Sequence, residues 1–203
     1  MTHRTPPPAH LLERDDPTDH PLSFRHRVEE TLFESRQVFL FGEINEKVSA
    51  WVTKQLVALA TLSDDPITLL INSPGGHVEA ADTVFDMISW ISAPVQVLGT
   101  GWVASAGAHI FLAPPRERRF ALPNTRFMLH QPWGGARGQA VDIGIEAEEI
   151  VKMRRRLNQT IADQTGQPLD KVEKDTDRNF WMSANEALEY GIVGKVVARP
   201  DEF

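Results

Sequence analysis

Short apolar segments alternate with amphipathic segments along the first half of this sequence, and this alternation limits the fold more than any other feature. Runs at residues 37–41, 67–71 and 95–98 are apolar and have the length of buried β-strands. Between them, apolar residues recur at helical spacing over residues 48–59 and 78–88. Strands and helices that alternate in this way favour right-handed βαβ units on a largely parallel sheet. The sequence therefore predicts an α/β fold of stacked βαβ units.

The length and the proline distribution indicate one domain with a tail. A chain of 203 residues, 41% of them hydrophobic, can bury one substantial core but is short for two. Residues 1–24 contain five prolines among charged residues and histidines, without strand or helix periodicity. We expect a flexible N-terminal arm over residues 1–24 and a single domain over residues 25–203.

Charge and cysteine content exclude several classes of function. The net charge of −7 disfavours nucleic acid as a partner, because an acidic surface repels phosphate backbones. The absence of cysteine excludes disulfides, thiolate zinc sites and cysteine nucleophiles, and it fits a reducing compartment. The sequence shows neither an apolar run of membrane-spanning length nor a signal peptide, so we expect no membrane contact and a cytoplasmic location.

Two of the predicted strands are followed by residues suited to acyl chemistry. Pro74-Gly75-Gly76 follows the second strand, and Ser105 follows the third, within the first turn of a compact helix predicted over residues 101–113. A serine at such a position can attack a carbonyl while the N–H groups of Gly76 and Ala106 hold the oxyanion. Taken singly, a glycine pair is usually a turn and a serine among alanines a packing residue, so the hypothesis needs a base.

Residue spacing alone leaves three histidines as candidates for that base. Outside the predicted arm these are His77, His109 and His130. His109 lies four residues after Ser105 on the same predicted helix, whereas His130 ends a strand predicted over residues 126–129. Spacing does not choose between them.

The second half of the chain contains an unusually long helix. After predicted strands at residues 119–122 and 126–129, a glycine-rich segment at 133–139 leads into a charged helical pattern over residues 141–164. This helix is longer than the core of so small a domain requires, so we predict that it projects and packs against another subunit. Two basic clusters are assigned to solvated faces or intersubunit ion pairs: Arg116, Arg118 and Arg119, and Lys152, Arg154, Arg155 and Arg156.

Seven stretches of the sequence resemble, in the same order, the consecutive motifs of Clp protease proteolytic subunits. They are INSPGG at 71–76, GWVASAGA at 101–108, FALPN at 120–124, MLHQP at 128–132, GGARGQA at 134–140, TGQP at 165–168 and EKDTDR at 173–178. The resemblance covers roughly residues 31–198. Seven motifs in register are far more specific than any one of them.

The resemblance implies a crotonase-like Clp protease fold and a serine endopeptidase site. It implies that Ser105 is the nucleophile and His130 the base, with the N–H groups of Gly76 and Ala106 as the oxyanion hole. In this family a glycine-rich strand binds extended peptide through backbone hydrogen bonds. Its counterparts here are Gly134, Gly135, Ala136, Arg137 and Gly138.

The resemblance also implies an assembly and its partners. Residues 133–165, here called the handle, resemble the strand and helix that interlock two heptameric rings into a closed tetradecamer, and Asp177 and Arg178 match a pair that contacts the opposite ring. The implied substrates are unfolded polypeptides, and the implied partners are an AAA+ unfoldase of the Clp type and further copies of this or a related subunit. The unfoldase would use the ATP, because this chain has no phosphate-binding loop of the Gly-x-x-x-x-Gly-Lys-Ser/Thr type. We expect neither a cofactor nor a metal in the chain itself.

Departures from the family pattern leave alternatives open. Asn179 occupies the position where the third catalytic residue is usually aspartate, and Asp177 is the other candidate for that role. Trp102, Val103 and Ala106 replace the more common glutamine, alanine and methionine around the nucleophile. The leading hypothesis is an active peptidase. The second is a weakly active subunit that completes or regulates a mixed Clp ring, and the third is a crotonase-type acyl-CoA enzyme, which would leave Ser105 and His130 without roles.

Overall fold

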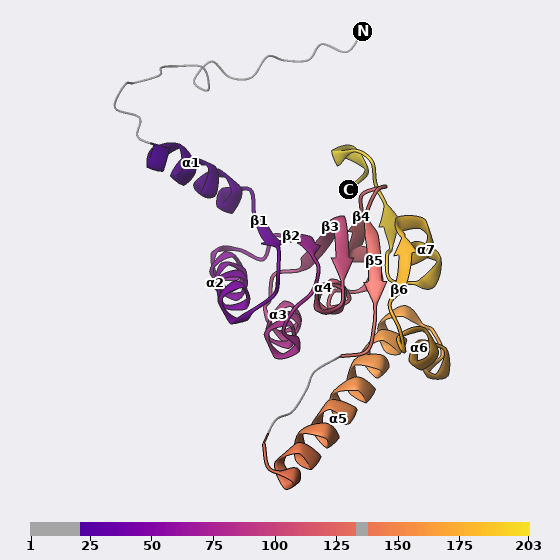
Figure 1. Ribbon diagram of the computed structural model, residues 1–203. Helices are drawn as coiled ribbons and strands as arrows, with labels where there is room; N and C mark the ends of the chain where they lie inside the picture. Colours follow the sequence, from indigo (N-terminus) through magenta and orange to yellow (C-terminus); the bar gives the residue numbers. More distant parts are fainter. Residues whose placement is uncertain (1–20, 133–137) are drawn as a thin grey trace, which may run out of the picture. The chain divides into compact units, whose positions relative to one another are not determined.

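The computed structural model describes residues 21–132 and 138–203, and it divides the chain into two compact units, residues 1–35 and 36–203 (Figure 1). In the first unit, α1 (Pro21–Glu34) is the described element. The predicted arm lies outside the described residues up to residue 20. Its last four residues, 21–24, belong to the first turn of α1, so the predicted boundary at residue 24 differs from the structure there.

The second unit alternates strands and helices over most of its length. Its elements in chain order are β1 (Gln37–Phe41), α2 (Glu46–Leu62), β2 (Ile67–Ser73), α3 (Val78–Trp90), β3 (Val95–Ala104), α4 (Ala106–Phe111), η2 (Arg116–Arg118), β4 (Arg119–Ala121), β5 (Arg126–Leu129), α5 (Ala140–Thr165), α6 (Leu169–Asp175), β6 (Phe180–Ser183), α7 (Ala184–Tyr190), β7 (Lys195–Val196) and η3 (Pro200–Glu202). Strands β1, β2, β3, β4 and β7 are neighbours in that order and run parallel. β5 runs parallel to β3, and β6 is antiparallel to β5. The predicted α/β class is confirmed.

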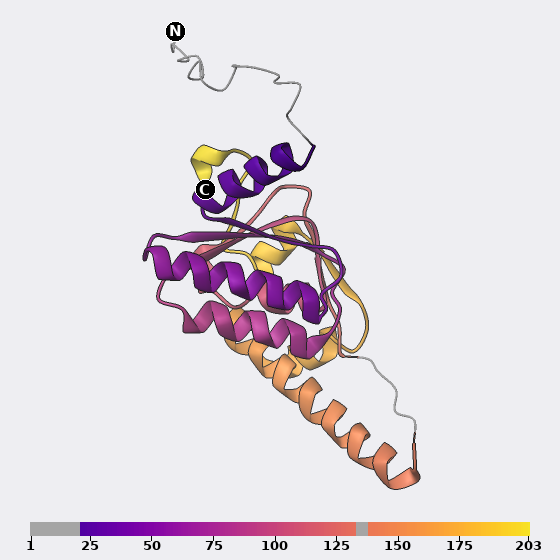
Figure 2. The same ribbon diagram turned by 90° about the vertical axis from the view of Figure 1, so that its left-hand side faces the viewer.

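Burial along β2 shows why this sequence forms a covered sheet. Ile67, Leu69 and Ile71 are fully buried, while the residues between them are half-buried. Because side chains of a strand alternate between its two faces, one face of the sheet is more completely covered than the other. α2 and α3 lie side by side against that sheet, with Leu56 and Val84 fully buried (Figures 1 and 2). Apolar burial on this scale is the main driving force for the fold.

β3 is longer than the sequence predicts, and the helix after it is correspondingly shorter. The prediction of a helix over residues 101–113 is wrong for residues 101–104, which are the last residues of β3. These residues pair with β5, with Trp102 opposite Arg126 and Ala104 opposite Met128. Trp102 and Val103 favour strand conformation, and the pairing with β5 extends the strand up to the small residues that begin α4. α4 begins at Ala106, so that Ser105 immediately precedes the helix.

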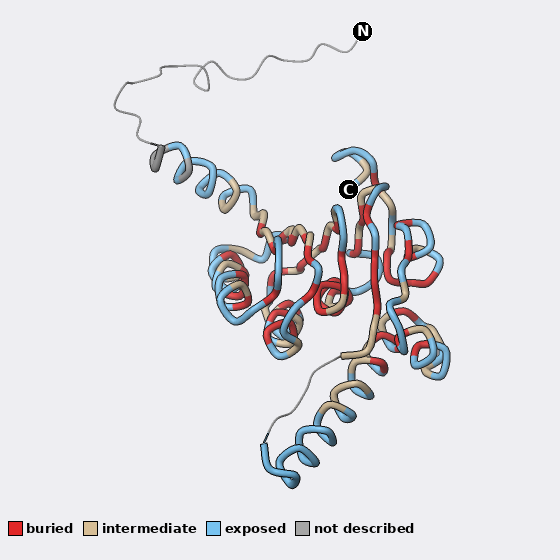
Figure 3. The backbone as a smooth tube through the Cα atoms, in the orientation of Figure 1, coloured by how far each residue is buried: buried red, intermediate tan, exposed pale blue. Residues whose placement is uncertain are grey.

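α5 is the longest helix, and its two halves have different surroundings. Its buried residues all lie in the last two turns: Asn158, Ile161, Ala162 and Thr165. The first half is exposed (Figure 3), and its large exposed apolar side chains are Val141, Ile143, Ile145 and, further along, Val151. Within residues 21–132 and 138–203, no helix has the length and apolar content needed to cross a membrane. The predicted long helix is thus present, within one residue of its predicted bounds at each end.

For Arg119, the assignment to a solvated face or an intersubunit ion pair is wrong. Its side chain is 1% exposed, with Nε donating to the carbonyl of Pro114 at 2.6 Å and Nη1 to the carbonyl of Gln164 at 2.9 Å. Burial, with the nearby charge of Arg116, lowers the pKa of Arg119 to about 10. The guanidinium thereby joins the start of β4 to the end of α5, since buried polar groups need hydrogen-bond partners.

Two glycines at the ends of α5 and α7 allow the cost of backbone strain to be compared with the cost of a steric clash. Gly166 and Gly191 end α5 and α7 in the left-handed region, at φ 74° and 96°. A Cβ on Gly166 would meet no atom within 4 Å, whereas one on Gly191 would lie 2.3 Å from the carbonyl oxygen of Thr165. We expect Gly166→Ala to lower the free energy of unfolding by about 1–2 kcal/mol from backbone strain alone, and Gly191→Ala to lower it by clearly more. Urea unfolding at one fixed protein concentration measures the free energy of unfolding of both variants. Equal losses of stability would show that the backbone near Gly191 shifts to accommodate the added Cβ at no cost in free energy.

Candidate active site

Three strand ends meet at one edge of the sheet and carry the predicted catalytic residues there. β2, β3 and β5 are neighbouring parallel strands, with Ser73 opposite Val103 and Ala104 opposite Met128. Parallel strands end at the same edge of a sheet, where α/β proteins place their ligands. The structure therefore brings together the glycine loop after β2, Ser105 after β3 and His130 after β5.

Ser105 and His130 are in direct contact. His130 Nε2 lies 2.6 Å from Ser105 Oγ. The Ser105 N–H donates to the carbonyl of Met128 at 2.8 Å, which fixes the serine against the strand that carries His130. Its backbone has φ 53° and ψ −120°, a region that non-glycine residues rarely occupy and that costs about 1–3 kcal/mol. Such strain persists only where the surrounding structure imposes it, and it is typical of functional sites.

The surroundings of His130 suit a general base. Burial lowers the pKa of His130 below its ordinary value, and a hydrogen bond with the side chain of Asn179 opposes part of this shift. The following residue is also fixed, because the N–H of Gln131 donates to the carbonyl of Thr176 at 2.7 Å. A histidine with a lowered pKa is neutral near pH 7 and can accept the serine proton.

The two candidates for the third residue have different partners. The side chain of Asn179 hydrogen-bonds the His130 ring. The carboxylate of Asp177 instead contacts Gln131 at 3.3 Å, Arg154 at 3.5 Å and Arg178 at 3.3 Å. Asp177 is half exposed and Arg178 is 85% exposed, so both remain available for contacts outside this chain.

Gly76 occupies a position that only glycine can take. The N–H of Ile44 donates to the carbonyl of Gly75, and the N–H of His77 donates to the carbonyl of Ile44, both at 2.9 Å. The Gly75 carbonyl and the His77 N–H therefore both point toward Ile44. Backbone groups of successive residues in an extended segment alternate in direction, so the N–H of Gly76 points away from Ile44. A Cβ on Gly76, at φ 150°, would lie 2.1 Å from the Ile44 carbonyl oxygen. The loop therefore leaves this N–H unobstructed by any side chain of its own.

Gly75 and Ala106 complete the surroundings of the serine. A Cβ on Gly75 would lie 2.6 Å from Ser105 Cβ, so the glycine loop packs directly against Ser105. Ala106 is the first residue of α4, and the first N–H groups of a helix have no partner within it. The predicted oxyanion hole of Gly76 and Ala106 N–H groups is compatible with this arrangement and stays a prediction.

A groove of about 710 Å³ runs past these residues. Its lining includes Gly75, Gly76, Ser105 and His130, together with residues of α5 such as Ile150. Of the predicted substrate-binding strand, Gly134, Gly135, Ala136 and Arg137 lie outside the described residues. Gly138, at φ 154°, is the described member.

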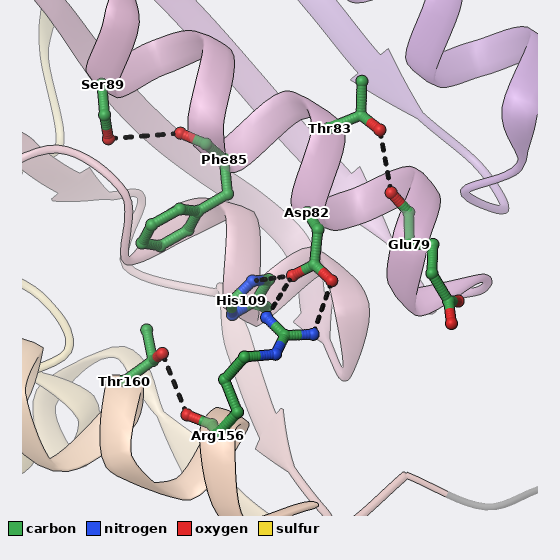
Figure 4. A network of polar contacts seen from close by, with 8 residues as sticks. All are labelled: Glu79, Asp82, Thr83, Phe85, Ser89, His109, Arg156 and Thr160. Carbon is green, nitrogen blue, oxygen red and sulfur yellow. Dashed lines mark hydrogen bonds and ion pairs between the residues drawn. The ribbon is translucent and has the colours of Figure 1, made fainter. Parts of the chain in front are cut away.

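The other two histidines have different partners. His77 is exposed, and its Nδ1 lies 3.3 Å from Glu79 Oε2. His109 Nε2 lies 2.9 Å from Asp82 Oδ1, and its ring stacks on Phe85 with centroids 4.6 Å apart (Figure 4). Of these three histidines, His130 is the one in contact with Ser105.

Arg156 and Asp82 form part of a network that the sequence analysis missed. Arg156 lies on an exposed face, as the sequence assignment allows, with 51% of its side chain exposed, and it binds Asp82 of the same chain with both terminal guanidinium nitrogens, at 2.9 and 2.6 Å (Figure 4). Burial by itself would raise the pKa of Asp82, but hydrogen bonds from His109 and Arg156 and their charges lower it to about 2. The two partners lie 74 residues apart, so no local pattern could reveal them.

The described residues offer no evident metal centre. Across residues 21–132 and 138–203, no three side chains of His, Asp or Glu converge as ligands would.

Comparison with known proteins places this chain in one family. The Clp protease family model matches residues 24–200. The chain is 55% identical to ATP-dependent Clp protease proteolytic subunit 3 of Rhizobium etli, over 91% of this chain and 95% of that protein. It is 57% identical to proteolytic subunit 2 of Gluconobacter oxydans, over 87% of this chain and 80% of that protein.

Solved structures agree with the sequence comparisons. An asparagine-to-aspartate mutant of ClpP1 from Listeria monocytogenes is 52% identical, with a TM-score of 0.81, over 86% of this chain and 98% of that one. The unmodified ClpP1 of the same organism is 51% identical, with a TM-score of 0.78 over the same shares. These findings favour the Clp protease interpretation over an acyl-CoA enzyme, and the chain belongs to the Clp protease family.

Proposed function

We propose that this chain is the proteolytic subunit of an ATP-dependent Clp protease, a serine endopeptidase in which Ser105 is the nucleophile and His130 the general base. The observation that carries the assignment of residues is the 2.6 Å contact between His130 Nε2 and Ser105 Oγ. It occurs where three strand ends meet, in a chain of the Clp protease family.

The proposed reaction follows from the positions of these groups. Ser105 Oγ attacks the carbonyl carbon of the substrate peptide bond while His130 Nε2 takes its proton. The N–H groups of Gly76 and Ala106 stabilise the negative oxygen of the tetrahedral intermediate. His130 then gives its proton to the leaving amine, and an acyl group remains on Ser105. A water molecule, deprotonated by His130, attacks the acyl group and releases the second product.

Asn179 changes the electrostatics of this reaction but keeps the orientation of the ring. Its side chain hydrogen-bonds His130, so it can help to fix the ring position. It carries no charge, however, and therefore stabilises the imidazolium that forms during attack less than a carboxylate would. Asn179 is the observation that favours a second candidate, a weakly active subunit of a mixed Clp ring.

The assembly is proposed on the basis of α5. Its last turns are anchored in the domain, while its first half presents exposed apolar side chains, including Val141, Ile143 and Ile145. Exposed apolar surface of this kind marks interaction sites. We infer that the handle pairs two heptameric rings, with Asp177 and Arg178 at the same interface. A separate AAA+ unfoldase would feed unfolded chains into the chamber and use the ATP.

The catalytic pair is tested by Ser105→Ala and His130→Ala. We expect each to lower peptide hydrolysis by several orders of magnitude, about 10³-fold or more, because the nucleophile or its base is lost. Fluorophosphonate labelling should disappear in Ser105→Ala. Ser89→Ala is the matched control, since the Ser89 hydroxyl is exposed and donates only to the carbonyl of Phe85 in its own helix, and it should retain full activity. Full activity in either catalytic variant would refute the site.

The third residue is tested by Asn179→Asp and by the pH dependence of kcat/KM. The base acts when neutral, and burial lowers the pKa of His130 below its ordinary 6.5, so the acidic limb of the wild type should lie below pH 6.5. A carboxylate at position 179 stabilises the imidazolium, so Asn179→Asp should raise hydrolysis, by up to about 10⁴-fold, and move the limb to higher pH. An unchanged rate in Asn179→Asp, with loss of activity but intact assembly in Asp177→Ala, would instead identify Asp177.

The assembly is tested by placing a charge on the exposed half of α5. Ile145→Asp should separate paired rings, because a carboxylate cannot be buried there without a partner. Glu148→Gln, on the same exposed half of the helix, should leave pairing intact. Native mass spectrometry reports the number of subunits, and a protein that remains double-ringed in Ile145→Asp would contradict the role given to this half of the handle.

A further inference from the structure

The groove that contains Ser105 and His130 also collects negative charge from three separate elements. Its lining includes Glu43 from the loop after β1, Glu79 from the first turn of α3 and Glu146 from α5. These glutamates are far apart in the sequence, so it is the fold that brings them to one groove. Their common position beside the catalytic pair asks for an explanation in terms of what the groove binds.

The described lining holds no lysine or arginine that would balance these charges. Along the groove wall that residues 21–132 and 138–203 provide, the charged side chains besides histidine are the three glutamates. The imbalance in the whole chain is milder, with 28 acidic and 21 basic residues. A cleft lined by charges of one sign focuses their field and attracts ligands of the opposite sign. The described lining therefore favours a cationic ligand next to Ser105.

Two of the three carboxylates have no partner among the described residues. Glu43 and Glu146 are exposed, and neither forms an ion pair or a side-chain hydrogen bond within residues 21–132 and 138–203. Neither carboxylate thus contributes a contact that stabilises the described fold. Both are available to pair with a cation that enters the groove.

Glu79 is partly compensated and has a smaller share in this potential. Its Oε2 lies 3.3 Å from His77 Nδ1. Hydrogen bonding to Asp82 raises the pKa of Arg156 above its ordinary value, and the charge of Glu79 contributes to the shift. The negative charge of Glu79 is therefore offset in part by Arg156, unlike the charges of Glu43 and Glu146.

Apolar surface next to Glu146 indicates the kind of cation that fits. Ile150 and Met153 line the same groove, four and seven residues further along α5. Residues at this spacing share one face of a helix. Lysine and arginine combine an apolar stem with a charged head. Such a side chain can lay its stem on Ile150 and Met153 while its head reaches Glu146, whereas a small inorganic cation would leave the apolar surface unused.

We propose that this groove is a subsite for basic side chains, in which Glu43 and Glu146, with a smaller contribution from Glu79, favour substrates that carry lysine or arginine within a few residues of the cut bond. The inference rests on the proposed function, because it takes Ser105 as the point of cleavage. It names basic segments of unfolded proteins as the substrate class that is cut fastest. The glutamates determine specificity and take no part in breaking the bond.

The test uses the assembled full-length protein and matched fluorogenic peptides. One residue is lysine, acetyl-lysine or glutamate, placed in turn at each of three positions on either side of the cut bond. Acetyl-lysine keeps the apolar stem and removes the charge. At one position or more, lysine should exceed acetyl-lysine in kcat/KM by about fivefold, the upper range for an exposed ion pair, and glutamate should fall below both. At about 1 M salt, where the Debye length is about 3 Å, the preference should largely disappear.

Charge-neutral variants connect the preference to the named residues. Glu43→Gln and Glu146→Gln should each lower the ratio of lysine to acetyl-lysine rates, and the double variant should bring it close to one. Glu148→Gln is the matched control, because Glu148 is exposed on the same helix and does not line the groove; its ratio should equal that of the wild type. Native mass spectrometry checks that every variant assembles, and a general defect lowers all rates together without changing the ratio. A wild-type ratio of one at every position, or an undiminished ratio in the double variant, would overturn the proposal.

Failure of the proposed function gives a different result from failure of this inference. Fluorescent forms of the same peptides, bound to Ser105→Ala and followed by anisotropy, report the groove without any turnover. If the wild type cuts no peptide but Ser105→Ala binds the lysine peptide about fivefold more tightly than the acetyl-lysine peptide, the groove inference stands and the proposed function fails. Cleavage without any preference for lysine leaves the function in place and refutes the inference. Neither cleavage nor binding would refute both.

Discussion

The site depends on one feature of the sheet, the change of partner along β3. The first part of this strand pairs with β4, with Val97 opposite Arg119, and the last part pairs with β5, with Ala104 opposite Met128. Between them, Gly101 at φ 62° lets the strand turn toward its new partner. Because Ser105 and His130 follow the second pairing directly, their 2.6 Å contact is set by strand register, which a one-residue slip would destroy.

That register also supports the strained backbone of the serine. The bond from the Ser105 N–H to the Met128 carbonyl and the bond from the His109 N–H to the Ser105 carbonyl hold it from both sides. The conformation places the hydroxyl at the strand end instead of within the helix. The free-energy cost of the strained backbone is offset by the stability of the surrounding sheet. The Ser105 hydroxyl is therefore oriented before any substrate arrives, which is what the proposed acyl transfer requires.

Much of the fold was predictable from sequence because its signals are local. Apolar runs and helical spacing located β1, β2, α2, α3 and α5 to within a few residues. The C-terminal half of β3 was not predictable in this way, since Trp102 to Ala104 belong to the sheet only through their pairing with β5. The choice of His130 over His109 came from the family resemblance, and the geometry agrees with it. Buried Arg119 was misassigned, and the partner of exposed Arg156 was not foreseen, because sequence gives charge but not the distant groups that compensate it.

Only the C-terminal half of α5 packs against its own domain, and this affects a newly made subunit before it meets a partner. The half of the helix that carries Val141 and Ile145 is exposed in the single chain, and few contacts with its own domain protect it. Until that surface is covered, it can adhere to other apolar surfaces. The unassembled subunit is therefore prone to aggregate, and more so as its concentration in the cell rises. Local opening is also easiest where burial is sparse, which makes the uncovered half of α5 a natural point of attack for other proteases. Subunits left over from an unbalanced supply would thus be removed selectively, while those that find a partner surface survive.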